Sequence, residues 1–130
     1  MSDEEQIRQL QAVYVQRTDD GDARGKSDLF ADRAIYYPAS SEVMAREDIY
    51  NVLASRAAGQ PKDRHSKHMC GNSVIRISGD AAEAATDYVV YVRVGEGAWE
   101  ISQIGRYYDR FVRQGDQWFF SENRPVKLGP

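Results

Sequence analysis

The chain has 130 residues, of which 42% are hydrophobic and 28% are charged, and its formal net charge is −3. This length is typical of one domain, and the composition excludes a disordered, collagen-like or membrane-spanning chain. The Lys and Arg residues are scattered along an acidic chain, which argues against a nucleic-acid partner because phosphate-binding surfaces concentrate basic residues. We therefore expect a single globular domain over residues 1–130.

The N-terminal segment and the cysteine content narrow the expected location and chemistry. The first ten residues, MSDEEQIRQL, are acidic and helix-forming, whereas a secretory signal needs a basic segment followed by an apolar one. No apolar run approaches the length that spans a bilayer. Cys70 is the only cysteine, and the two histidines are His65 and His68, so neither an internal disulfide nor a complete metal site is expected. These features predict a cytoplasmic protein without membrane contact and without a bound metal.

The first predicted helix begins after Ser2. Ser2 and Glu5 have the capping-box spacing, in which each side chain bonds a backbone N–H that the first helical turn leaves unpaired. Apolar residues then recur at helical spacing, at Ile7, Leu10, Val13 and Tyr14. The helix is expected to end near Asp19 and Asp20, an unfavourable place for acids because the carboxyl end of a helix carries partial negative charge.

Shorter elements are predicted between residues 21 and 60. Ser27 is typical of the cap of a short second helix that continues through residues 29–31. The segment AIYYP, residues 34–38, predicts a short strand closed by its proline. The apolar spacing of residues 46–58 predicts a third helix.

Residues 65–126 predict four long strands, because β-branched and aromatic residues alternate there. Compact turns with glycine separate the strands at residues 78–80, 95–97 and 114–116. Helices followed by an antiparallel meander indicate an α+β fold, a cone-shaped barrel in which a curved antiparallel or mixed sheet wraps around the N-terminal helices. The mouth of such a cone is a natural apolar pocket.

The first long strand carries the residues with the most informative chemistry. Without a bulge, His68, Cys70 and Asn72 point to one face of the sheet and Met69 and Gly71 to the other. A bulge at Gly71 would change this alternation for the residues that follow.

Several features of the chain occur together in one known family. They are Tyr14, Asp19 and Asp22, the AIYYP segment, the R-E-D-I start of the third helix, His68 with Asn72 four residues later, Gly79 with Asp80, and the terminal segment GRYYDRFVRQGDQWFFSENR. In order and spacing the chain resembles the SnoaL-like branch of the nuclear transport factor 2-like superfamily over nearly its whole length. The resemblance implies the cone-shaped fold and a homodimer or homotrimer.

The resemblance also implies a catalytic dyad. In several enzymes of this superfamily, an Asp at the end of the first helix orients a His on the long strand. These enzymes are scytalone dehydratase, bile-acid dehydratases, hexachlorocyclohexane dehydrochlorinase and the lyases that release formaldehyde from lignin-derived diaryl compounds. Asp19 and His68 match these positions, and Tyr14 resembles the tyrosine that faces the substrate in the bile-acid dehydratases. The match implies that His68 is the general base, Asp19 its orienting residue and Tyr14 a hydrogen-bond donor to the substrate.

The chemistry of these side chains is suited to elimination. A neutral imidazole has a reference pKa of about 6.5, and a carboxylate on its other nitrogen fixes the tautomer. Tyrosine hydroxyls, from Tyr14 or from whichever of Tyr36 and Tyr37 faces inward, can assist a leaving group. Such chemistry needs neither a metal nor an organic cofactor. We expect further contacts to the substrate from Tyr37, Asn72, Tyr107 and Trp118.

The sequence therefore predicts a lyase that removes water, or another small group such as formaldehyde, from a hydrophobic, ring-bearing small molecule. An isomerase or cyclase with the same dyad is one alternative, and a non-catalytic module that binds a small hydrophobic ligand is another. The enzyme hypothesis requires Asp19 and His68 within hydrogen-bonding reach inside one enclosed pocket. Arg106 and Arg110 are expected on the outer, solvated face of the sheet.

Overall fold

The first helix, α1 (Asp3–Asp19), has the bounds that the sequence predicts. The computed structural model of the protein describes residues 1–129. The hydroxyl of Ser2 accepts the backbone N–H of Glu5 at 3.1 Å, and the carboxylate of Glu5 accepts the N–H of Ser2 at 3.2 Å. The predicted capping box is therefore confirmed. None of the helices in residues 1–129 combines the length and the apolar character that crossing a bilayer requires.

The second helix, α2 (Ala23–Ser27), lies earlier in the chain than predicted. Asp22 caps it by accepting the backbone N–H of Gly25 at 2.9 Å, so the helix ends at Ser27, the residue expected to begin it. The backbone that follows pairs with the sheet instead, because the carbonyl of Leu29 accepts the N–H of Phe120 at 2.8 Å. The prediction of helix over residues 29–31 was wrong. The third helix, α3 (Arg46–Gly59), confirms its prediction.

Within residues 1–129, six strands form one mixed sheet. Across the sheet they follow the order β2 (Met44–Ala45), β1 (Phe30–Tyr36), β6 (Gln117–Lys127), β5 (Glu100–Gln114), β4 (Ala81–Val94) and β3 (Arg64–Ser78). All neighbours are antiparallel except β1 and β6, which are parallel. The glycines of the three predicted turns, Gly79, Gly95 and Gly115, have positive φ as those turns require. The sheet is curved but not closed, since β2 and β3 remain its edges, so the expected barrel is an open cone.

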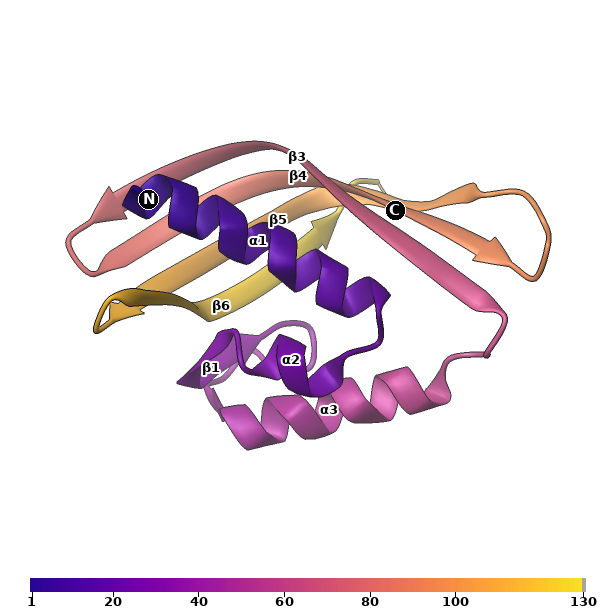
Figure 1. Ribbon diagram of the computed structural model, residues 1–130, viewed down its shortest axis with the longest axis horizontal. Coiled ribbons are helices and arrows are strands. Elements are labelled where there is room, and N and C mark those ends of the chain that lie inside the picture. The colour runs from indigo at the N-terminus through magenta and orange to yellow at the C-terminus, as the bar shows by residue number, and fades with distance from the viewer. Residues whose placement is uncertain (130) are drawn as a thin grey trace.

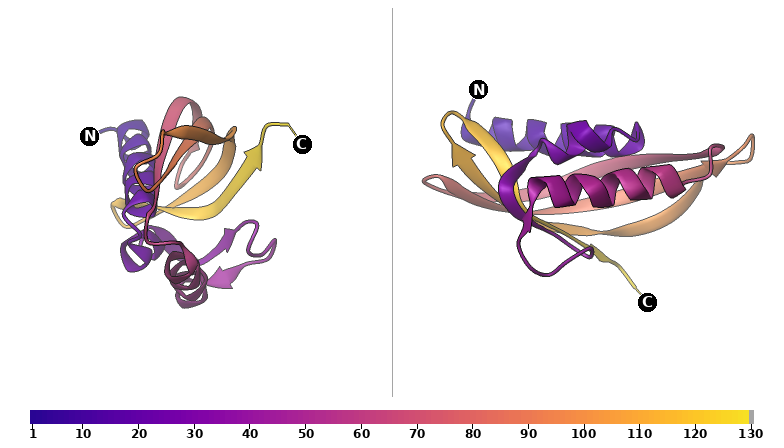
Figure 2. Two further views of the ribbon diagram at one scale, coloured as in Figure 1. Left: turned by 90° about the vertical axis from the view of Figure 1, so that its right-hand side faces the viewer. Right: turned by 90° about the horizontal axis from the view of Figure 1, so that it is seen from below.

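The helices cover the inner face of the curved sheet. In Figure 1 the long strands arch over α1, and α2 lies between α1 and α3 below the arch. The end-on and lower views of Figure 2 show the same arrangement, with the sheet curling to one side of the helices. The fully buried core between α1 and the sheet contains Ile7, Phe30, Phe111 and Phe120. The rings of Phe111 and Tyr14 each contact the ring of Phe120, with centroids 4.8 Å apart.

A bulge on β3 decides which of its side chains face the helices. Cys70 lies opposite Tyr88 and Ser73 opposite Thr86, so two residues of β3 are set against one residue of β4. Ser73 therefore returns to the inner face, where its hydroxyl lies 2.7 Å from that of Thr86. The expected alternation holds from His68 to Cys70 and fails beyond Gly71.

Candidate active site

Asp19 and His68 form a partly buried pair between the end of α1 and β3. The carboxylate of Asp19 accepts the backbone N–H of His68 at 3.0 and 3.1 Å, and its Oδ1 lies 2.5 Å from Nδ1 of the imidazole. The hydroxyl of Ser66 donates to the same carboxylate at 3.3 Å. The two side chains are only 10% and 17% exposed. These donors offset the unfavourable position of an acid at the carboxyl end of a helix.

The carboxylate determines how the imidazole of His68 can act. Because Nδ1 faces the acceptor Asp19, the neutral ring carries its proton on Nδ1 and has its lone pair on Nε2. Within residues 1–129, Nε2 makes no hydrogen bond to the protein. The ring is therefore arranged as a base whose reactive nitrogen is free for a ligand.

The pair opens into a cavity of about 660 Å³ on the inner side of the sheet. Its walls come from the end of α1, from α2 and α3, and from the inner faces of β3 to β6. The lining includes Tyr14, Asp19, Lys26, Tyr36, Tyr37, Leu53, Arg56, His68, Val90, Tyr107 and Asn123. Asp19 and His68 are thus hydrogen-bonded to each other on the wall of one cavity, which is partly open because exposed residues such as Tyr37 also line it.

Tyr14 belongs to a buried hydrogen-bonded chain. Its hydroxyl donates to Oδ1 of Asn123 at 2.8 Å, and Nδ2 of Asn123 donates to the carboxylate of Asp109 at 2.8 Å. Since a hydroxyl has one proton, Tyr14 offers the cavity its oxygen as an acceptor and not the donor that the resemblance implies. Burial raises the pKa of Asp109 to about 7, with a smaller contribution from the charge of Glu122, whereas the bonds from Asn123 and the Arg124 backbone oppose the rise.

Tyr36 retains a proton that it can donate. Its hydroxyl accepts Nη1–H of Arg56 at 3.0 Å, and its ring is 6% exposed on the cavity wall. Burial raises the pKa of Tyr36, and the charge and hydrogen bond of Arg56 oppose the rise. Tyr37 also lines the cavity, but 39% of its surface is exposed. Of the two neighbouring tyrosines, Tyr36 is the better-placed acid.

The remaining residues expected to contact the substrate lie in three places. Tyr107 lines the cavity and stacks on Tyr88 with ring centroids 4.2 Å apart. Trp118 does not line it, because its buried indole donates to the carboxylate of Asp3 at the opposite end of α1. Asn72 does not line it either, because the bulge removes it from the face that carries His68. The structure therefore brings only Tyr37 and Tyr107 of these four to the dyad.

Four polar residues in or behind this cavity were not identified from the sequence: the buried Lys26, Asp109 and Asn123, and the exposed Arg56. Asp109 had a signal, since it alternates with the inward-facing Tyr107 and Phe111 on β5. Lys26 had none, because a helix of five residues is too short for a periodic pattern.

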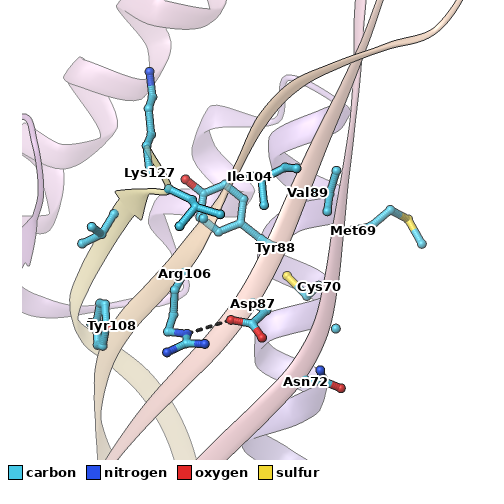
Figure 3. Close-up of a pocket in the computed structure, with 14 residues that line it drawn as sticks. Met69, Cys70, Asn72, Asp87, Tyr88, Val89, Ile104, Arg106, Tyr108 and Lys127 are labelled. Carbon is cyan, nitrogen blue, oxygen red and sulfur yellow. Dashed lines mark hydrogen bonds and ion pairs between the residues drawn. The ribbon is translucent and has the colours of Figure 1, made fainter. Parts of the chain in front are cut away.

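A second groove, of about 730 Å³, lies along the sheet (Figure 3). Asn72, Met69, Ile104 and Tyr108 line it, and Arg106 there forms an ion pair with Asp87 at 2.7 Å. Arg106 and Arg110 are exposed, as predicted for the outer face of the sheet.

Comparisons with known proteins agree with this architecture. The sequence profile of the SnoaL-like domain matches residues 1–124. The chain belongs to the SnoaL-like family. No protein with a curated function matches it.

Three solved structures illustrate the range of this family fold. A protein of unknown function from Mycobacterium tuberculosis has a TM-score of 0.81 at 21% identity and covers 95% of this chain and 74% of its own. A candidate scytalone dehydratase from Novosphingobium aromaticivorans has a TM-score of 0.80 at 18% identity, covering 96% and 83%. A candidate dehydratase of the NTF2-like family from Streptomyces avermitilis has a TM-score of 0.80 at 14% identity, covering 98% of both chains. At these identities the likeness establishes the fold alone.

Proposed function

We propose that this SnoaL-like protein is a lyase that uses Asp19 and His68 to eliminate a small leaving group from a hydrophobic, ring-bearing molecule. The observation that carries the proposal is the carboxylate of Asp19, which holds Nδ1 of His68 and leaves Nε2 free within the cavity. General acid–base catalysis of this kind contributes about 10²- to 10⁴-fold to a rate.

The proposed step is dehydration across a carbon–carbon bond. Nε2 of His68 removes a proton from carbon, and Asp19 stabilises the imidazolium that forms. The hydroxyl of Tyr36 gives its proton to the departing oxygen, so that water leaves, and Arg56 stabilises the resulting phenolate. The imidazolium proton then returns to Tyr36 through solvent, which restores both groups. Release of formaldehyde is a variant in which His68 takes the proton from the hydroxyl of a CH₂OH group and its carbon–carbon bond breaks. The carbon that keeps the electron pair of that bond then takes a proton from Tyr36.

The walls of the cavity support a hydrophobic substrate. Tyr107, Leu53 and Val90 line it beside the polar groups, and a flat ring can stack on such surfaces. The names of two fold relatives as candidate dehydratases agree with the reaction class. The alternatives from the sequence remain: an isomerase or cyclase returns the proton to the same molecule, and a binding module performs no reaction.

A product assay tests the proposal. A panel of ring-bearing alcohols and diaryl diols is incubated with the wild type, with His68→Ala and with His65→Ala, and the products are analysed by mass spectrometry. The proposal predicts loss of the mass of one water or one formaldehyde with the wild type and His65→Ala, and no product with His68→Ala. An unchanged mass with a shifted structure indicates the isomerase. Ligand-induced rises in melting temperature that are equal in all three proteins, without product, indicate the binding module.

A further inference from the structure

Lys26 is a buried cation without a counter-ion. Only 7% of its surface is exposed, although lysine is almost never buried unless it is paired. Within residues 1–129, its Nζ has no hydrogen bond or ion pair. Instead it lies over the rings of Tyr14 and Tyr36, 4.6 and 5.6 Å from their centroids. These rings attract a cation but accept no strong hydrogen bond from it.

The ammonium group of Lys26 is reached from the cavity. Every fully enclosed side-chain nitrogen or oxygen in the described residues has a hydrogen-bond partner. Since Nζ has none, it cannot be fully enclosed, and Lys26 is one of the residues that line the cavity of His68. The N–H donors of Lys26 therefore lack an acceptor among the described residues, and part of the ammonium group is accessible.

A second cation faces the same tyrosine ring. The guanidinium carbon of Arg56 lies 5.4 Å from the centroid of Tyr36, and Arg56 lines the same cavity. The carboxylate that acts on Lys26, Asp19, is already bonded to His68. The two cations thus line one cavity in which the nearest acid is bonded to His68. Arg56 is exposed and Lys26 is buried, so a bound anion would offset the cost of burying the charge of Lys26.

The charge of the cavity differs in sign from that of the chain. Five Lys and Arg residues line it against three Asp residues, whereas the whole chain has a net charge of −3. Of the three acids, Asp20 and Asp22 are exposed, and Asp22 caps α2. Of the five cations, Arg56 and Lys127 are exposed as well, so the less exposed lining carries Arg17, Lys26 and Arg64 against Asp19.

We propose that Lys26 and Arg56 form an anion-binding subsite, which holds a carboxylate or another negatively charged oxygen group of a ring-bearing ligand. The inference deepens the proposed function, on which it rests, by naming a substrate class: an aromatic or polycyclic acid, or a compound that becomes an oxyanion in the cavity. Such a subsite also stabilises negative charge that develops when His68 removes a proton from carbon.

The protonation of Lys26 supports this assignment. Burial lowers the pKa of Lys26 to about 7; the charge of Arg56 lowers it further and that of Asp19 raises it. A bound anion raises this pKa, so binding is accompanied by proton uptake near neutral pH. Asp109, behind Tyr14 and Asn123, has a pKa raised to about 7 by its burial, so it titrates over the same range. A variant of Lys26, rather than pH alone, therefore decides the question.

Isothermal titration calorimetry with two probes of one shape, 2-naphthoate and the neutral 2-naphthamide, tests the subsite. At a pH of about 6, where Lys26 is charged, the wild type is expected to bind the carboxylate at least about tenfold more tightly than the amide. Lys26→Met is expected to remove most of this preference, and Lys26→Arg to retain it. Lys67→Met, which changes an exposed lysine on β3, is the matched control and keeps the preference.

Several results overturn the inference: absence of 2-naphthoate binding by the wild type, equal affinity for the two probes, or a preference that survives in folded Lys26→Met. If Lys26→Met does not fold, the inference is tested by whether the wild type prefers the carboxylate to the amide and whether Lys26→Arg retains this preference. His68→Ala separates the two proposals, since it abolishes turnover and leaves the preference for the carboxylate intact. A preference without any lyase activity contradicts the proposed reaction alone, and turnover without a preference contradicts the subsite alone.

Discussion

His68 gains its proposed role from contacts that fix both its backbone and its ring. Asp19 accepts the backbone N–H and Nδ1 of the same histidine, so the position of the strand and the orientation of the imidazole depend on one carboxylate. This double contact preorganises the base before a ligand arrives. It also explains why an acid at the end of α1 is tolerated there.

Two buried groups near the dyad, Asp109 and Lys26, predict an unusual dependence of stability on pH. Burial raises the pKa of Asp109 from 3.8 to about 7, so between these values the unfolded chain releases a proton that the folded chain holds, and stability falls as pH rises. Burial lowers the pKa of Lys26 from 10.5 to about 7, so above pH 7 the unfolded chain holds a proton that the folded chain has released, and stability rises with pH. The two contributions produce a minimum near pH 7.

Urea unfolding across this pH range checks the prediction. Each group changes the free energy of unfolding by at most about 1.4 kcal/mol per pH unit. Lys26→Met is expected to be more stable than the wild type below pH 7 and to lose this advantage towards the alkaline end. Asp109→Asn is expected to flatten the acidic side of the profile. Variant profiles that run parallel to the wild-type profile would contradict the assignment of these pKa values.

At the scale of the residue, the sequence predicted the dyad but not its polar neighbours. Asp19 and His68 were identified because a family pattern fixes their order and spacing. Asp109 was predictable from alternation on β5, since Tyr107 and Phe111 point inward. Lys26 was not, because its burial depends on how a single helical turn lies against two tyrosine rings.

Among the elements, strand β5 leaves room for a tyrosine of the cavity wall. Its Gly105 lies opposite Tyr88 and has no side chain that would occupy the space of the Tyr88 ring. A methyl group at Gly105 would lie 2.7 Å from the hydroxyl of Tyr88 and would overlap the backbone carbonyl of Val126. Tyr88 is 98% buried and stacks on Tyr107, so neither ring can move freely. The absence of a side chain is therefore a packing requirement of this wall.

Gly105→Ala is expected to lower the free energy of unfolding by about 1–3 kcal/mol, the usual cost of overpacking. Gly71→Ala is the matched control, because a methyl group on Gly71 of β3 meets nothing within 4 Å. Chemical denaturation of both variants measures the difference. Equal stability of the two variants would show that the sheet relaxes around the added methyl group.

For helices and strands, the sequence predicted the type of each element better than the register in which neighbouring strands pair. The capping box, the third helix and the three glycine turns follow from short-range patterns, and the structure confirms them. The bulge on β3 depends on the pairing with β4, and a shift of one residue exchanges the faces of the sheet. That shift removed Asn72 from the cavity. The early cap at Asp22 likewise moved α2 away from its predicted place.

For the whole molecule, the outer face of the open sheet carries exposed apolar residues that the proposed site does not use. One groove on this face is lined by four apolar or aromatic residues that are each between 40% and 51% exposed: Met69, Ile104, Tyr108 and Val126 (Figure 3). Contiguous apolar patches are uncommon on monomeric proteins. We propose that a second copy of the chain covers this face, as in the homodimer that is one of the two assemblies, homodimer or homotrimer, that the family resemblance implies.

Size-exclusion chromatography with light scattering checks this proposal. The wild type is expected to have twice the mass of one chain, and Ile104→Arg to have the mass of one chain, because a charge would be buried in the contact. Val43→Arg is the control, since Val43 is exposed and does not line the groove, and its substitution is expected to leave the mass unchanged. A monomeric wild type at high micromolar concentration would overturn the proposal.

The most direct test of the account compares two adjacent aspartates. Asp19 and Asp20 both line the cavity, but of the two only Asp19 bonds His68. Turnover of a substrate identified in the product assay is measured for the wild type, Asp19→Asn and Asp20→Asn at the same pH. We predict a fall of about 10²- to 10⁴-fold for Asp19→Asn and a change of no more than a few-fold for Asp20→Asn. Comparable rates for the two variants would contradict the assignment of Asp19 and His68 as the catalytic pair.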